Sequence, residues 1–228
     1  MRTAAAVALA AILAGFGAFW ISLPPAAPLR TSNPASTALI DARMQAARKK
    51  GHAGKRNQHW VPLARISPWL QKAVINSEDA RFYQHHGFDV VETGVVIEKA
   101  VEEGRLGRGA STITQQLAKN LWLGEERSLL RKAREYFLAK RLETLGKDRI
   151  LELYLNVVEW GDGIYGADAA ARVWFHKPAA EITPEEAAML AAMLPAPRRR
   201  NPDHPSAALK KRAAEIYALY SVYHQQFQ

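Results

Sequence analysis

An uninterrupted apolar segment near the amino terminus constrains the fold of this chain more than any other feature. No charged residue occurs between Thr3 and Leu29, and the stretch from Ala4 to Leu23 is almost entirely Ala, Val, Leu, Ile, Gly, Phe and Trp. At about 1.5 Å per residue it would form a helix of about 30 Å, the thickness of a bilayer's hydrocarbon core. We therefore predict an uncleaved transmembrane helix with Trp20 at its interface. A cleaved signal peptide and a buried soluble helix are the alternatives.

The rest of the 228 residues is enough for one globular domain. We predict a transmembrane anchor at 1–28, a basic juxtamembrane stalk at 29–59 and a single domain at 60–228. Four prolines follow the apolar segment: Pro24, Pro25, Pro28 and Pro34. They interrupt regular structure, so the stalk is expected to be extended or irregular. The sequence has no cysteine, which excludes disulfides, thiolate zinc sites and cysteine nucleophiles.

The positive charge is concentrated at the two ends of the predicted soluble part. Residues 30–60 hold seven Lys and Arg against Asp41, and residues 198–228 hold six against two acids, whereas residues 61–197 hold 17 against 19. A nucleic-acid-binding fold would carry a basic face on its core, so we expect no nucleic-acid partner. Basic residues beside an anchor are each worth about 1 kcal/mol against anionic lipid headgroups. A solvated linker is the alternative interpretation.

Helical patterns dominate from Val61 onward, and alternating strand patterns are scarce, so the domain is predicted to be mainly α. Capping residues mark the expected helix starts: Ser67 before Pro68, Ser128, Asp148, Thr183 with Glu186, and Ser206. The helix after Ser128 is expected to bury Leu130, Ala133 and Phe137 on one face.

Glu78 is the first candidate for chemistry. It follows the apolar pair Val74-Ile75 and precedes an aromatic pair, and this setting could desolvate the carboxylate and raise its pKa toward that of a proton acceptor. An ordinary exposed glutamate is the alternative. His85 and His86 are adjacent and cannot both face one metal from a helix, so we do not expect a metal site there.

The second candidate segment is Gly109 to Asn120, in which small residues lead into a helix that begins at Ser111 or Thr112. The free N–H groups of a helix start favour an anion. Thr112 with Gln115 also satisfies a capping box, which would make these residues structural. The spacing does not choose between the two interpretations.

The third candidate segment is strongly basic. Seven cations lie between Lys119 and Arg141 against three acids, inside a domain core that is otherwise slightly acidic. Arg131 and Glu135 are four residues apart and could be a surface ion pair. The local excess of cations instead indicates a bound anion. A fourth segment, 151–166, ends in a glycine turn and is expected to be scaffold.

The four motifs together carry a resemblance. They are Glu-Asp-x-x-Phe-x-x-His-x-Gly-Phe-Asp at 78–89, Gly-Ala-Ser-Thr-Ile-Thr-Gln-Gln at 109–116, Arg-Lys-x-x-Glu at 131–135, and Tyr-Leu-Asn with Gly-Asp-Gly-Ile-Tyr-Gly at 154–166. This order resembles the family 51 peptidoglycan glycosyltransferases from about Trp60 to Pro197. The length left over holds no transpeptidase domain, so the chain is most similar to the monofunctional biosynthetic peptidoglycan transglycosylases. The resemblance implies a mainly α, lysozyme-like lobe.

The resemblance also implies a reaction and roles. Such enzymes join the 4-hydroxyl of the N-acetylglucosamine of lipid II to C1 of the lipid-linked sugar of the growing strand, with release of undecaprenyl diphosphate. By this likeness Glu78 is the general base and Glu135 the second catalytic carboxylate. The expected substrate-binding residues are Ser111, Thr112, Gln115, Gln116, Lys119, Arg127, Arg131 and Lys132. Mg²⁺ or Mn²⁺ is expected on the substrate diphosphate, with Glu135 as a candidate contact.

The same likeness implies a location and partners. The anchor would lie in the bacterial inner membrane with the domain on the periplasmic side, and lipid II and the growing strand would be the substrates. Cell-wall synthesis or division proteins are candidate partners. The stretch from Val90 to Arg108 is hypothesised to be a flap over the lipid channel, freed by Gly104, Gly107 and Gly109.

Two other functions fit parts of the sequence. A lysozyme-type hydrolase would also use one glutamate in a helical lobe, but the cleavage of a neutral glycosidic bond gains little from nearby cations. A membrane-anchored scaffold would bind wall-synthesis proteins through its basic ends, and Glu78→Gln would then have no effect in cells.

Overall fold

The computed structural model describes residues 2–103, 111–124, 126 and 128–225. Before the second motif the elements are α1 (Arg2–Ile21), η1 (Ala27–Arg30), α2 (Ala38–Lys49), β1 (Asn57–Gln58), η2 (Leu63–Arg65), α3 (Pro68–Glu78) and α4 (Val90–Glu103). The middle elements are α5 (Ile113–Ala118), the π-helix η3 (Lys119–Leu123), α6 (Leu129–Leu142), η4 (Glu143–Leu145) and α7 (Lys147–Val157). The last elements are β2 (Glu159–Gly161), β3 (Ile164–Tyr165), α8 (Ala167–Phe175), η5 (Ala179–Glu181), α9 (Pro184–Met193) and α10 (Ala207–Gln225).

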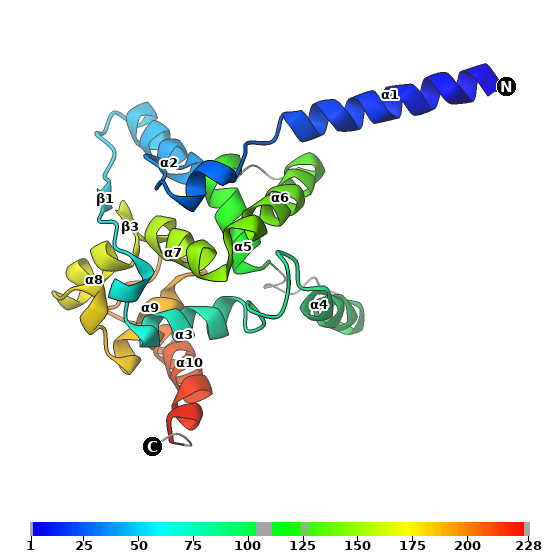
Figure 1. The fold of residues 1–228 in the computed structure, drawn as a ribbon. Helices are drawn as coiled ribbons and strands as arrows, with labels where there is room; N and C mark the ends of the chain where they lie inside the picture. The colour runs from blue at the N-terminus through cyan, green and yellow to red at the C-terminus, as the bar shows by residue number, and fades with distance from the viewer. Residues whose placement is uncertain (1, 104–110, 125, 127, 226–228) are drawn as a thin grey trace.

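The lobe is built around α3, α5, α7 and α9, while α1 extends away from it (Figure 1). One apolar core joins Leu70 of α3, Leu117 of α5, Leu151 of α7 and Leu190 of α9, all fully buried. The mainly α prediction is confirmed. The carboxyl end of α3 lies next to α5, where Glu78 accepts a hydrogen bond from Gln116. The last helix, α10, returns along α9 and α3.

A small sheet was not predicted from the sequence. Its order is β1-β3-β2, with β1 parallel and β2 antiparallel to β3, and Asn57 is paired with Ile164. Strands of two or three residues are too short to show an alternating pattern, so the sequence carries no signal for them. Gly163 has φ 75°, and a Cβ atom there would lie 2.4 Å from the Cβ of Lys55. Only glycine fits this turn without strain.

The prediction that the stalk is extended or irregular is wrong for residues 38–49, which form α2. The last of the prolines, Pro34, lies before this helix, and the hydroxyl of Thr37 caps it by accepting from the amide of Ile40. Leu39 and Ile40 are buried against Tyr165 of β3. The segment after the anchor therefore packs on the lobe.

The predicted apolar face of α6 is wrong at two of its three residues. Leu130 and Ala133 are exposed, whereas Phe137 is partly buried and packs against the core. The buried residues of α6 are Glu135, Leu138, Ala139 and Leu142. The first turn of α6 reaches beyond the lobe, so Leu129 and Leu130 are 91% and 58% exposed. The apolar periodicity correctly predicted an amphipathic helix. It did not predict which face is buried, because Glu135, an acidic residue, lies on the face that meets the core.

Most predicted helix starts are confirmed. Ser128 and Thr183 accept hydrogen bonds from Arg131 N and Glu186 N, and the hydroxyl of Ser206 accepts from Leu209 N. Asp148 is not a cap, because Gly146 occupies the N-cap position of α7. Ser67 holds the N-cap position of α3, but its hydroxyl donates to the carbonyl of Ile182 at 2.8 Å instead of capping.

Two further predictions concern the anchor and the flap. Among the described helices, α1 from Thr3 to Ile21 is long and apolar enough to cross a membrane, with a mean hydropathy of 2.2. Part of the proposed flap, 90–103, forms α4. Gly104, Gly107 and Gly109 lie outside the described residues, so the flap remains a hypothesis.

Candidate active site

Glu78 is the last residue of α3 and its side chain is only 12% exposed. One carboxylate oxygen, Oε2, accepts a hydrogen bond from Nε2 of Gln116 at 2.9 Å. Burial raises the pKa of Glu78 above its ordinary value, and the Gln116 hydrogen bond and the charges of Arg212, Lys119 and Arg200 oppose that rise. The carboxylate is therefore suited to accept a proton.

The amide of Gln116 is held in one orientation. The hydroxyl of Tyr154, on α7, donates to Oε1 of Gln116 at 3.0 Å, which leaves Nε2 to face Glu78. Burial raises the pKa of Tyr154 well above its usual range, so its hydroxyl keeps the proton that it donates. Tyr154 was predicted only as scaffold, and here it orients the residue that contacts Glu78.

The carboxyl-terminal part of the chain supplies charge that the sequence interpretation missed. Nη2 of Arg212, on α10, lies 4.0 Å from Oε1 of Glu78, and Arg200 lowers the pKa of the same carboxyl group. Both residues belong to the basic region 198–228, which was interpreted as a flank because sequence distance hides its return to α3. A local motif could not have identified them.

The second carboxylate, Glu135, lies on α6 and is 3% exposed. Nη1 of Arg131 donates to its Oε2 at 2.5 Å, and Nζ of Lys132 donates to its Oε1. Lys132 also donates to Oγ of Ser111 at 3.1 Å. The structure thus brings four predicted residues together at one point, which we call the cation group: Ser111, Arg131, Lys132 and Glu135.

Gln116 connects the cation group to Glu78. Its Nε2 donates to Oε2 of Glu78 at 2.9 Å and approaches the carbonyl of Ser111 at 3.4 Å. A proton-accepting carboxylate and a group of cations therefore lie on either side of one glutamine side chain. This arrangement suits a reaction that removes a proton at one atom and develops negative charge on a leaving group nearby.

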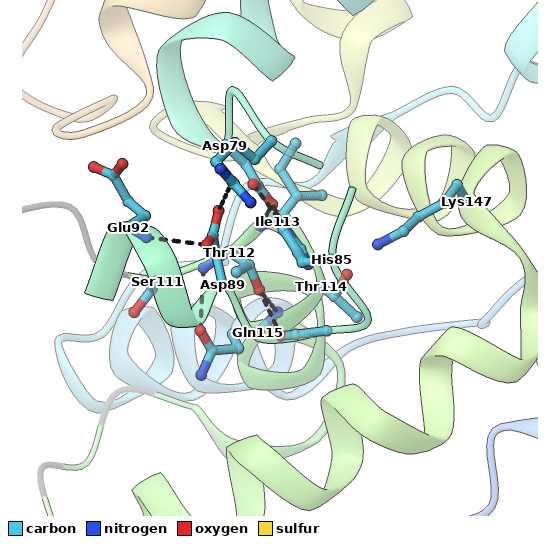
Figure 2. A network of polar contacts seen from close by, with 12 residues as sticks. Asp79, His85, Asp89, Glu92, Ser111, Thr112, Ile113, Thr114, Gln115 and Lys147 are labelled. Atoms are coloured by element: carbon cyan, nitrogen blue, oxygen red, sulfur yellow. Dashed lines mark hydrogen bonds and ion pairs between the residues drawn. The ribbon is translucent and has the colours of Figure 1, made fainter. Parts of the chain in front are cut away.

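Thr112 and Gln115 are buried and form the capping box at the start of α5, one of the two interpretations left open by the spacing. The hydroxyl of Thr112 also donates to the carbonyl of Gly87 at 2.8 Å. The hydroxyl of Thr112 and Oε1 of Gln115 are used in these hydrogen bonds, and the expected role of the two residues in substrate binding stays a prediction. Figure 2 shows this cap beside Asp79 and His85.

Asp79, next to Glu78, belongs to a buried network that holds the first motif on α5 (Figure 2). It accepts from Nε2 of His85 at 2.8 Å and from the amide of Ile113 at 2.9 Å. Asp89 is paired with Arg81 at 3.0 Å and accepts from the amide of Glu92. One ligand atom each from Asp79, His85 and Asp89 lies within 4.8 Å of the others. Both carboxylates accept hydrogen bonds from backbone amides, whereas the buried Nδ1 of His85 has no hydrogen-bond partner among the described residues.

A polar cavity of about 170 Å³ lies beside Gln116 and Lys119. Leu39 and Arg43 of α2 line it on one side, and Val158 and Leu194 line it elsewhere. Arg43 is held by Glu159 of β2, with Nη2 3.1 Å from Oε2. The juxtamembrane helix α2 thus contributes to the surroundings of the site, which the sequence interpretation also missed. Arg127 lies outside the described residues.

Each oxygen of Glu135 accepts one hydrogen bond from a cation, Oε2 from Arg131 and Oε1 from Lys132. An ionised carboxylate has further lone pairs, so these bonds leave room for contact with a divalent ion. The predicted contact of Glu135 with a diphosphate-bound ion stays a prediction. The prediction that a divalent ion binds through the substrate diphosphate stays a prediction.

Comparison with known proteins gives consistent results. The family model described as Transglycosylase matches residues 45–220. The chain is 49% identical over 167 residues to the biosynthetic peptidoglycan transglycosylase of Thiobacillus denitrificans, covering 73% of this chain and 72% of that protein. It is 45% identical over 209 residues to the protein of the same name from Rhodospirillum centenum, covering 91% of this chain and 87% of that one.

Proposed function

Because the chain belongs to the transglycosylase family, a family of peptidoglycan glycosyltransferases, we propose that its lobe polymerises lipid II into β-1,4-linked glycan. The observation that carries the proposal is the position of Gln116 between Glu78 and the carbonyl of Ser111, at 2.9 Å and 3.4 Å. Lys132 donates to the hydroxyl of the same Ser111 at 3.1 Å, so the base Glu78 and the cation group lie on either side of Gln116. A glycosyl transfer from a lipid diphosphate needs both.

The proposed step begins at Glu78. Its carboxylate takes the proton of the acceptor's 4-hydroxyl while that oxygen attacks C1 of the donor sugar from the face opposite the diphosphate. The bond between C1 and the diphosphate oxygen breaks, and its electron pair leaves with undecaprenyl diphosphate. Attack from the opposite face inverts C1, so an α-linked diphosphate gives a β-linked product.

The leaving diphosphate is stabilised by cations in this proposal. Lys119, Arg131 and Lys132 supply charge-assisted hydrogen bonds of about 1.5–3 kcal/mol each. Glu135 holds Arg131 and Lys132 in place, since it accepts from both. Glu135 would therefore act by orienting these two cations. Mg²⁺ or Mn²⁺, bound mainly by the diphosphate, would neutralise further charge.

A membrane location belongs to the same proposal. The apolar helix α1 would anchor the enzyme in the inner membrane, with the lobe on the periplasmic side, where lipid-linked substrate is met. Its length and hydropathy support this placement. The exposed pair Leu129 and Leu130 supports it too, because α6 contacts the end of α1 through Phe137. Cell-wall synthesis or division proteins remain candidate partners.

Polymerisation of purified lipid II tests the proposed function. The protein is incubated with lipid II in detergent with Mg²⁺, and the products are separated on a gel before and after muramidase digestion. We expect a ladder of polymer that muramidase removes and that EDTA diminishes. A hydrolase would instead shorten finished glycan without forming polymer, and a scaffold would do neither. Either result, with lipid II shown usable by a known transferase, would contradict the proposal.

A further inference from the structure

The outer end of α1 is held by one arginine of the lobe. Nη2 of Arg141, on α6, donates to the carbonyl of Trp20 at 2.8 Å, and Nη1 donates to the carbonyl of Leu23 at 2.6 Å. The guanidinium group also lies over the ring of Trp20, 4.5 Å from its centroid. The carbonyl of Trp20, in the last turn of α1, also accepts from the amide of Leu23 at 3.3 Å, so Arg141 adds a second donor at this helix end.

We call these contacts of Arg141 with Trp20 and Leu23 the clamp. Aromatic packing between α6 and α1 stabilises the same junction. The ring of Phe137, one turn before Arg141, lies 5.5 Å from Phe19, 5.8 Å from Trp20 and 6.2 Å from Phe16, each in an edge-to-face arrangement. Leu23 follows directly and is buried in the core of the lobe. The chain thus passes from α1 into the lobe through packed residues, and the junction is held in one orientation.

The same helix carries the cation group. Arg131, Lys132 and Glu135 lie on α6 with Arg141, and Lys132 reaches Ser111 at 3.1 Å. The ten residues from Lys132 to Arg141 are separated by nine rises and span about 14 Å along an α-helix. Because α6 is continuous over this length, a shift of Arg141 relative to α1 would move Arg131, Lys132 and Glu135 with it. The place of the cation group relative to α1 is therefore set at Arg141.

We propose that Arg141 is a positioning residue that fixes the cation group of α6 at the depth of a membrane-embedded lipid diphosphate. The inference rests on the proposed function, because it requires the lipid-linked substrate and the anchor to share one bilayer. The diphosphate of such a substrate is confined to the headgroup layer, so a lobe that tilts or rises on its anchor misplaces its cations. In detergent a short-chain substrate is free of that restriction and reaches the site in any orientation.

Activity in two settings separates positioning from folding. Arg141→Ala is compared with wild type and with Arg65→Ala, an exposed arginine of η2, first in proteoliposomes with lipid II and then in detergent with a short-chain analogue. We expect Arg141→Ala to lose about tenfold or more of the rate in proteoliposomes and to stay within about twofold in detergent. Arg65→Ala should match wild type in both. Equal losses in both settings, or no loss in proteoliposomes, would overturn the proposal.

A distance measurement tests the clamp without any activity. The sequence has no cysteine, so spin labels at Ala14→Cys on α1 and Ala133→Cys on α6 report one distance. We expect a narrow distribution in bilayers for wild type and a clearly broader one for Arg141→Ala. An unchanged distribution would refute the clamp. A wild type that makes no polymer in either setting would instead refute the proposed function, while this measurement would still decide on the clamp.

Discussion

The pKa of Glu78 is set by burial and by neighbouring groups that act in opposite directions, and each neighbouring group can be substituted separately. Burial raises the pKa of its carboxyl group, and Gln116, Arg212, Lys119 and Arg200 lower it. A base in this position must be ionised to act, yet must hold a proton well enough to take one from a sugar hydroxyl. The balance between burial and the neighbouring cations therefore sets the pH range of activity.

Removal of Arg212 should shift the acidic side of the pH–rate profile. Its charge lowers the pKa of Glu78, so Arg212→Gln raises that pKa and moves the acidic limb of kcat/KM to higher pH. Lys211→Gln, at the exposed neighbouring position, is the matched control and should leave the limb in place. An acidic limb that does not move in Arg212→Gln would show that this arginine does not influence the base.

The fold should become more stable when Glu78 loses its charge. Because the pKa of Glu78 is higher in the folded than in the unfolded state, the folded protein binds more protons, and stability falls as pH rises through and above the ordinary value of 4.5. The cost grows as the pH rises from the ordinary value through the raised folded-state pKa, and Glu78→Gln removes it. We expect a higher Tm for the variant at pH 7, by about 2–4 °C for each kcal/mol regained. The difference should shrink toward pH 4, and a lower Tm at pH 7 would contradict the assignment.

At the scale of elements, the start of α5 is the junction between the two first motifs. Its amide at Ile113 donates to Asp79, its cap residue Thr112 donates to Gly87, and Gln116 reaches Glu78 from its second turn. The first motif is thus fixed on α5 by hydrogen bonds, among them those of Asp79 and Thr112 (Figure 2). The position of Glu78 depends on this helix start through Gln116.

Loss of the cap should weaken both stability and activity. Thr112→Ala removes the hydroxyl that accepts from Gln115 and donates to Gly87, and a lost N-cap costs about 0.5–2 kcal/mol. Thr112→Ser keeps the hydroxyl and serves as the control. We expect a lower Tm and a reduced kcat for the alanine variant, with the serine variant close to wild type. The Tm is measured by thermal unfolding and kcat by the polymerisation rate. A Thr112→Ala variant with the Tm and kcat of wild type would show that the cap stabilises neither the fold nor the site.

The sequence predicted the elements whose signals are local. The caps at Ser128 and Thr183 are short patterns that depend on neighbouring residues only, and both are confirmed. At Thr112 the spacing left two interpretations open, and the capping box is the one that the structure has. The buried face of α6 was predicted wrongly, because Glu135 is stabilised inside by cations from its own helix. The helix α2 was missed because its burial depends on Tyr165, far along the chain.

At the scale of the whole molecule, distant parts of the chain converge on the site. The juxtamembrane helix α2 lines the cavity beside Gln116, and α10 returns to bring Arg212 to Glu78 (Figure 1). The motifs between residues 78 and 135 could be identified from the sequence. The approach of α2 and α10 to the site could not, because it depends on how the complete core packs. Glu78 and Arg212 are 134 positions apart in the sequence, and no local sequence pattern predicts that they lie close together.

The docking of α10 should be essential to the whole domain. Tyr220 is buried between α3 and α9, with its ring 6.0 Å from that of Trp69 and its hydroxyl donating to the carbonyl of Pro184. Truncation of a large buried aromatic residue costs about 3–5 kcal/mol. Tyr220→Ala should therefore lower the Tm by about 6 °C or more. Leu219→Ala, at an exposed position next to it, should have little effect, and equal effects of the two would contradict this packing.

The most direct test of the account is the rate of a single glycosidic bond formation with Glu78→Gln. Fluorescent lipid II is mixed with excess enzyme in a rapid-quench experiment, substrate binding is measured separately, and Glu181→Gln on an exposed turn is the control. For Glu78→Gln we expect substrate binding close to wild type and a rate about 10²–10⁴-fold lower, the contribution of a general base. A Glu78→Gln rate within about threefold of wild type would show that Glu78 does not accept the proton.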